Sequence, residues 1–193
     1  AGTIFKMTPE GVLTTLVFFY GENGGWGPTL VQGRDGDFYG TTMYGGFGYD
    51  PSRSDFGAGT VFRMTPEGTL TSLHRFSGSD GKWPSGGLLQ ASDGNLYGTT
   101  AAGGLKDLGT VFQTTPEGRL ITLASFDGTN GAGPDTDLVQ GADGNFYGTT
   151  RLGGTSGVGT VFRITPAGLL TTLISFNGTN GGSPKGLTVG SDG

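Results

Sequence analysis

The sequence repeats itself about every fifty residues, and this feature restricts the fold more than any other. The string Gly-Thr-(Ile/Val)-Phe starts at Gly2, Gly59, Gly109 and Gly159, at spacings of 57, 50 and 50 residues. Three further strings follow it in the same order: Thr-Pro-(Glu/Ala)-Gly, Phe-x-Gly-x-(Asn/Asp)-Gly and Asp-Gly, the last continuing into Tyr-Gly-Thr-Thr in three copies. A fixed period of this length is typical of repeat arrays such as propellers and solenoids.

The glycine content excludes a helical version of the repeat. Gly 42 and Pro 9 make up about a quarter of the 193 residues. Each glycine inside a helix costs about 1 kcal/mol relative to alanine. The segments between the turn signals are instead short and rich in β-branched and aromatic residues, as strands are. We therefore expect an all-β fold.

One unit predicts four short antiparallel strands, which we name A to D. They cover residues 87–91, 96–100, 110–114 and 120–126. The A–B and C–D connections are tight turns, and the B–C and D–A connections are long loops. This is the pattern of a β-propeller blade. A β-solenoid is the competing fold, but its coils are usually half as long and stack in parallel.

The whole chain reads as one repeat domain of about four units, forming a propeller-type array that is part of a larger ring. Strand A should recur a last time at 186–190, whereas strand B occurs only three times. We therefore predict either a segment of a longer repeat protein or a missing strand supplied by another chain through β-augmentation. The expected units are 1–28 (strands C and D of the first blade), 29–83, 84–133, 134–183, and 184–193 (strand A of a following or closing blade).

The repeat strings resemble a known family. Gly-Thr-Val-Phe-x-x-Thr-Pro-x-Gly, Leu-x-x-Leu-x-x-Phe and Asp-Gly-Asn-(Leu/Phe)-Tyr-Gly-Thr-Thr-x-x-Gly-Gly together look like the Gloeobacter/Verrucomicrobia ("GloVer", choice-of-anchor) tandem repeat of exported bacterial proteins. The resemblance implies a propeller-like array on a secreted or cell-surface bacterial protein, and it implies no reaction. The Asp-Gly-Asn-x-Tyr segment also resembles NHL-type propeller repeats, which mostly serve as binding platforms.

Charge and composition limit the kinds of binding partner that we expect. The net charge is −5, from Lys+Arg 11 and Asp+Glu 16, and the basic residues are scattered singly, so nucleic acid is not an expected partner. No apolar run approaches the ~20 residues of a membrane helix, so we expect no membrane insertion. The absence of cysteine excludes disulfides and thiolate chemistry.

The recurring side chains are expected to form the scaffold. The aromatic residues of strands B and C should pack between blades, and the aspartate of each Asp-Gly should form its turn. A calcium site built from Asp127, Asn130, Asp135 and Asp137 is conceivable, but only one unit carries those charges. We expect no metal and no cofactor. The aromatic residues in question are Phe62, Phe112, Phe162, Tyr39, Tyr97 and Tyr147.

The sequence contains few residues that could act as a catalytic nucleophile or base. Its single histidine, His74, takes a strand D position that is aliphatic in the other units, so a packing role is expected. Hydrolysis by a pair of carboxylates is an alternative, because several aspartates lie in the long loops. Their spacing in the sequence does not indicate that any two of them meet. We expect a non-enzymatic protein. The loop carboxylates are Asp50, Asp55, Asp107 and Asp135.

Specificity in an array of similar units should lie in the residues that break the repeat. In a propeller the B–C and D–A loops emerge on one face, which we expect to bind the ligand. Exposed aromatic rings beside polar groups suit stacking on sugars or anchoring a protein partner. Alternatively, both tryptophans fill gaps between blades. The candidates are Trp26, Tyr44, Phe47, Tyr49, Arg53, Phe56, Lys82, Trp83, Lys106 and Arg151.

These observations predict a binding or assembly module of an exported or surface-anchored bacterial protein. Its partner would be a protein, a glycan, or another copy docking through blade edges. The alternatives are a lectin-like propeller and a polysaccharide-active enzyme using loop carboxylates.

Overall fold

The computed structural model describes residues 2–27, 29–50, 52 and 55–190, and its strands build four antiparallel sheets plus one small hairpin. The first blade has only β1 (Gly2–Met7) and β2 (Leu13–Phe19). The other three blades each contain four strands. They are β3 (Val31–Gln32), β4 (Phe38–Thr42), β7 (Thr60–Met64) and β8 (Leu70–Arg75); then β9 (Leu89–Gln90), β10 (Leu96–Thr100), β11 (Thr110–Thr114) and β12 (Leu120–Ser125); then β13 (Val139–Gln140), β14 (Phe146–Thr150), β15 (Thr160–Ile164) and β16 (Leu170–Ser175).

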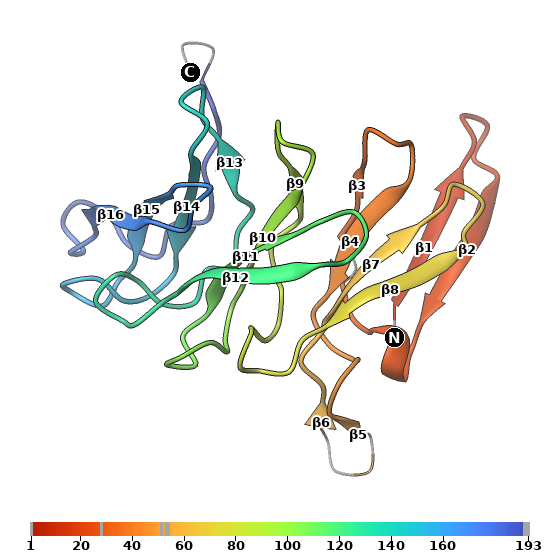
Figure 1. The fold of residues 1–193 in the computed structure, drawn as a ribbon, viewed down its shortest axis with the longest axis horizontal. Coiled ribbons are helices and arrows are strands. Elements are labelled where there is room, and N and C mark those ends of the chain that lie inside the picture. The colour runs from red at the N-terminus through yellow and green to blue at the C-terminus, as the bar shows by residue number, and fades with distance from the viewer. Residues whose placement is uncertain (1, 28, 51, 53–54, 191–193) are drawn as a thin grey trace.

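The blades lie side by side in an arc, with β1–β2 at one end and β13–β16 at the other (Figure 1). Within each four-stranded blade, the strands pair in chain order, so the predicted four-stranded antiparallel blade is confirmed for three units. The described part of the chain does not close into a ring. It contains no helix long and apolar enough to cross a bilayer.

The strand A expected at 186–190 is not formed among the described residues. In the complete blades strand A pairs only with strand B, as β9 pairs with β10. The segment at 186–190 has no strand B beside it, and an extended segment without ladder hydrogen bonds is not a sheet strand. Leu187 to Gly190 instead border a hollow beside Val139, Tyr147 and Val161.

Phenylalanine pairs connect each blade to the next. Phe19 of the first blade packs on Phe62 of the second, with ring centroids 5.0 Å apart. The pairs Phe76–Phe112 and Phe126–Phe162 repeat this contact at 5.2 Å between the later blades. All six rings are buried. Tilted and edge-on pairs of this kind contribute about 0.5–1.5 kcal/mol each beyond the area they bury.

The invariant glycine of Tyr-Gly-Thr-Thr makes room for these rings. Gly98 of β10 faces Phe112 of β11 across the ladder. A Cβ built on Gly98 would lie 2.6 Å from Cζ of Phe112, and Gly40 and Gly148 have the same relation to Phe62 and Phe162 at 2.5 Å. The motif is therefore a packing requirement and not a ligand-binding signature.

Buried threonine pairs fix the bases of the long loops. The hydroxyl oxygens of Thr100 and Thr110 lie 2.8 Å apart where the B–C loop leaves β10 and returns to β11. Thr42–Thr60 and Thr150–Thr160 repeat the pair at 2.8 Å. Each unit therefore presents its B–C loop from the same rigid base, and the loops differ mainly beyond it.

The first B–C loop is the long one. It contains the small hairpin β5 (Tyr49–Asp50) and β6 (Asp55–Phe56), which projects beyond the other loops at the lower edge of the molecule (Figure 1). The short 3-10 helix η1 (Gly21–Asn23) lies in the preceding D–A loop.

Candidate functional site

An aromatic-lined pocket lies between the first D–A loop and the first B–C loop. Its volume is about 570 Å³, within the usual range for small-molecule sites. We call it the aromatic pocket, because five of its eight lining residues are aromatic and the other three are glycines. It is lined by Tyr20, Trp26, Tyr44, Tyr49, Phe56, Gly21, Gly25 and Gly45.

Backbone hydrogen bonds join the two loops that form the aromatic pocket. Gly25 and Tyr44 bond each other reciprocally, with N···O distances of 2.8 and 3.1 Å. The amide of Gly46 donates to the carbonyl of Gly21 at 3.2 Å. Within the B–C loop, the amide of Gly45 donates to the carbonyl of Phe56 at 2.6 Å. The pocket walls are therefore positioned by the backbone without help from a ligand.

The rings around the pocket are unusually exposed for their size. Tyr20 is 72% exposed, Trp26 65% and Phe56 58%. Tyr44 packs on Phe56, with centroids 5.4 Å apart. Trp26 has φ 54°, a left-handed conformation that favours glycine, and the equivalent residue two units later is Gly133. The equivalent residues Trp83 and Ser183 share this conformation, so it is a property of the loop.

The aromatic pocket gathers residues that break the repeat. Tyr20 takes the place of Ser77, Asp127 and Asn177, and Tyr44 takes the place of Ala102 and Leu152. Tyr49 and Phe56 belong to the insertion that later units lack. These departures from the repeat, although separated in the sequence, thus meet at one place in the structure. Sequence comparison of the units could have identified Tyr20, which our sequence reasoning missed.

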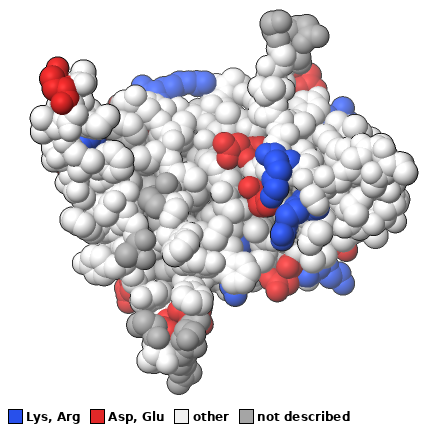
Figure 2. All heavy atoms as spheres, turned by 180° about the vertical axis from the view of Figure 1, so that it is seen from behind, with Lys and Arg blue, Asp and Glu red and all other residues white. Residues whose placement is uncertain are grey.

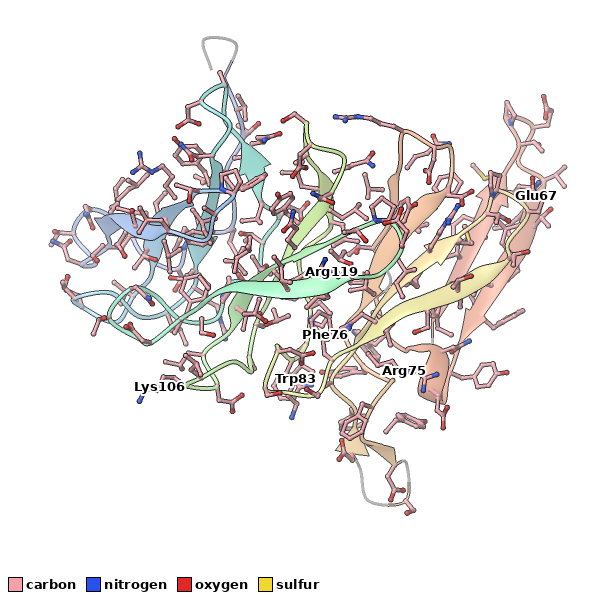
Figure 3. All side chains as sticks on the ribbon, in the orientation of Figure 1. Glu67, Arg75, Phe76, Trp83, Lys106 and Arg119 are labelled. Atoms are coloured by element: carbon pink, nitrogen blue, oxygen red, sulfur yellow. The ribbon has the colours of Figure 1, made fainter. Side chains whose placement is uncertain are left out.

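Trp83 occupies the position of Trp26 in the next unit but is half-buried. Its indole N–H donates to the carbonyl of Gly57 at 3.3 Å, and its ring meets the edge of Tyr44 at 6.3 Å. Lys82 lies 4.4 Å above the Trp83 ring. Trp83 therefore supports the base of the insertion and does not line the aromatic pocket. Figure 3 shows Trp83 beside the insertion.

A polar hollow of about 360 Å³ adjoins the aromatic pocket. It is lined by Tyr20, Glu22, Asn23 and Arg75, so Tyr20 borders both cavities. The guanidinium of Arg75 lies 3.4 Å from a carboxylate oxygen of Glu22. Neither charged residue was among the sequence candidates, although both break the repeat.

The remaining candidates lie elsewhere on the loops. Phe47 and Lys82 line a separate hollow of about 210 Å³ beside the insertion. Lys106 is exposed at the lower edge (Figure 3), and Arg151 pairs with Asp135 at 3.8 Å. Arg53 lies outside the described residues. The face in Figure 2 is mostly uncharged, in keeping with scattered charges.

His74 and Asp80 form a hydrogen-bonded pair in the second unit. Nε2 of His74 lies 2.7 Å from Oδ2 of Asp80, and the other carboxylate oxygen, Oδ1, accepts hydrogen bonds from the amide and the hydroxyl of Ser77. Burial alone would raise the pKa of Asp80, but hydrogen bonds from Ser77 and His74 outweigh it and lower that pKa. The pair anchors the D–A loop, a role that differs from the simple packing expected of His74.

Three acidic residues of the long loops form hydrogen bonds within their own loops. Asp55 accepts the amide of Gly57, and Asp107 accepts the amide of Gly103. Asp127 likewise accepts hydrogen bonds from Thr129 and Asn130. Among the described residues no group of three acidic, histidine or cysteine side chains could hold a metal ion.

Solved structures share this fold at low sequence identity. A gluconolactonase from Xanthomonas campestris aligns with a TM-score of 0.55 at 19% identity, over 87% of this chain and 53% of that chain. The extracellular domain of a protein assigned as a one-component system of B. thetaiotaomicron aligns with a TM-score of 0.60 at 13% identity, over 90% of this chain and 20% of that one. The chain thus spans about half the length of the gluconolactonase, and the likeness shows the fold alone.

A search of curated proteins found no match. The model of the Gloeobacter/Verrucomicrobia repeat, by contrast, matches residues 1–193. That match covers the whole sequence, with the repeated strings and propeller-like blades described above. The chain therefore belongs to the Gloeobacter/Verrucomicrobia repeat family.

Proposed function

We propose that this chain is a non-enzymatic binding module of an exported or surface-anchored bacterial repeat protein, and that its aromatic pocket binds a carbohydrate. The observation that carries the proposal is the convergence of five aromatic residues from two loops on one pocket. Exposed aromatic faces stack on the C–H faces of sugar rings, and tyrosine hydroxyls supply hydrogen bonds at the rim.

The arrangement of the long loops supports a binding role. Propeller arrays present long loops from a rigid scaffold, a common way to build a binding face. The gluconolactonase is only 19% identical to this chain, so the likeness concerns the fold and not the activity. The extracellular neighbour fits a protein exposed at the cell surface.

A loop exchange tests the proposal. Residues 43–58 are replaced by the sequence of 101–108, which occupies the same place between paired threonines in the next unit. Binding is measured on a glycan array with the parent chain and the exchange variant, and folding by circular dichroism. We expect the variant to fold and to lose the glycans that the parent binds.

The control grafts 43–58 in place of 151–158, between Thr150 and Thr160 of the last four-stranded blade. Asp127 and Gly133 take the places of Tyr20 and Trp26 there, so the graft should add no binding. A parent chain that binds no glycan, or an exchange variant that still binds, would show the proposal to be wrong. Release of reducing sugar from polymeric glycans, or hydrolysis of a sugar lactone, would favour the enzymatic alternative.

Association through blade edges is a second candidate function. Phe5 holds the position of Phe62, Phe112 and Phe162, yet it is 54% exposed while those three are buried. Each of the three lies under the phenylalanine of the preceding blade, so the first blade offers the same apolar face to another blade.

A further inference from the structure

Building on the proposed function, we propose that the ligand is an extended, uncharged chain of β-linked pyranose units that continues from the aromatic pocket over the Glu22–Arg75 pair. The aromatic pocket would hold one stretch of the chain. The polar hollow would hold the adjoining unit through its hydroxyl groups. The site would therefore read the interior of a polysaccharide and not a single terminal sugar.

Tyr20 connects the aromatic pocket with the polar hollow. It lines both the aromatic pocket and the polar hollow, whose volumes are about 570 and 360 Å³. A ring stacked near Tyr20 therefore has neighbouring space on both sides. The combined volume suits several linked units better than one.

Glu22 and Arg75 offer the hydrogen-bonding groups that a hydroxylated ring needs. They are separated by 3.4 Å, and their side chains are 78% and 46% exposed, so their outer oxygens and N–H groups remain accessible to a ligand. A carboxylate accepts hydrogen bonds and a guanidinium donates several, and hydrogen bonds with an ionised partner are stronger than neutral ones.

The charges of this pair also depart from the repeat. Residues equivalent to Glu22 are Ser79, Thr129 and Thr179. In the later blades the residues equivalent to Arg75 are Ser125 and Ser175. An acid and a base introduced at facing positions of two units, beside the aromatic pocket, indicate a joint role for both cavities.

The cavity chemistry selects an uncharged and flat ligand. The described lining of the aromatic pocket includes no charged residue, and Glu22 balances the charge of Arg75 in the hollow. The chain as a whole carries −5, which disfavours acidic polysaccharides. β-Linked rings with equatorial hydroxyls present C–H groups on both faces, which suits a pocket with aromatic rings from two loops.

Titration calorimetry with cello-oligosaccharides of two to six units tests the inference. Affinity should rise by about tenfold between the dimer and the tetramer, as the polar hollow fills, and then level off. The Glu22→Thr/Arg75→Ser variant, which uses residues of the later units, should keep the dimer affinity and lose the rise. Trp26→Gly should weaken every length to a similar degree.

The outcomes separate this inference from the function on which it rests. If the length dependence survives in the double variant while Trp26→Gly abolishes binding, the aromatic pocket binds sugars but the hollow does not, and the inference is overturned alone. If no oligosaccharide of any length binds, the inference is overturned, and the glycan array decides the proposed function separately. A rise that the double variant removes supports both.

Discussion

Trp26 and Trp83 show that one position in a repeat can serve two purposes. Both adopt the left-handed backbone conformation that their loop demands, with φ 54° and 60°. Trp26 borders the aromatic pocket and is 65% exposed, whereas Trp83 is half-buried and hydrogen-bonded. The surrounding loops, and not the residue type, decide which ring is free to bind.

Substitution of the two tryptophans should separate binding from stability. Trp26→Gly places the residue of a later unit at a position suited to it, so we expect lost glycan binding with little change in the melting temperature. Trp83→Ala should lower stability by about 1–2 kcal/mol, because it removes packing and a hydrogen bond. Thermal melting and calorimetry check both. Unchanged binding in Trp26→Gly would count against the aromatic pocket.

The His74–Asp80 pair should make stability depend on pH. The folded-state pKa of Asp80 lies below its ordinary value of 3.8, so its contribution is present above that pH and is lost as the pH falls through the lowered pKa. The His74→Val/Asp80→Asn variant restores the aliphatic–asparagine pattern of the other units. Its melting temperature should fall less steeply below pH about 4 than that of the parent. Parallel curves for the two proteins would show that the pair contributes nothing.

At the scale of elements, the blade is built around the contact between the glycine of strand B and the phenylalanine of strand C. The contact recurs in all three complete blades, where a Cβ added to the glycine would lie 2.5 or 2.6 Å from the ring. The added Cβ could be accommodated only by moving the ring, and the phenylalanine of the preceding blade holds that ring in place. The strictness of Tyr-Gly-Thr-Thr follows from this arrangement.

Gly98→Ala should therefore be strongly destabilising. The new methyl group would overlap the Phe112 ring, and overpacking of this kind typically costs about 1–3 kcal/mol. Gly25→Ala is the matched control for stability, because no heavy atom lies within 4 Å of its Cβ position and its φ is ordinary. Urea denaturation of both variants measures the difference. Equal midpoints would mean that the blade tolerates the added methyl group.

At the scale of the whole molecule, the array has two unlike end faces. One carries Phe5, and the other carries Leu173, which is 47% exposed although the equivalent Leu73 and Leu123 pack on glycines of the following blades. Gly11, the equivalent of those glycines, has no atom within 4 Å of its Cβ position. The two end faces therefore match the two halves of the interface that joins blades within the chain.

Mixing variants tests association through these faces. If copies join head to tail, Phe5→Ser and Leu173→Ser should each weaken self-association, because each lacks one half of the interface. Mixed together, the two variants should recover a dimer, since the first keeps Leu173 and the second keeps Phe5. Analytical ultracentrifugation measures the outcome. A parent chain that stays monomeric at high concentration would argue against the second candidate function.

Much of this architecture could be predicted from the sequence, because repetition makes local signals redundant. Strings that recur with glycine at turns and β-branched residues between them predict four-stranded blades, and three complete blades are present. The strand order also predicts on which face of the array the long loops lie. The repeat predicted a strand at 186–190 that does not form, because a strand needs a partner to pair with as well as a suitable sequence of its own.

The sequence by itself determined the repeat, the all-β class and the residues that depart from the pattern. Only the tertiary structure decided that Tyr20, Trp26 and the insertion share a pocket, that Trp83 supports it, and that Glu22 meets Arg75 across two units. The physical reason is that local backbone preference depends on nearby residues, whereas a binding site depends on distances between loops. Those distances are set by blade packing and by the hydrogen bonds that join one loop to the next.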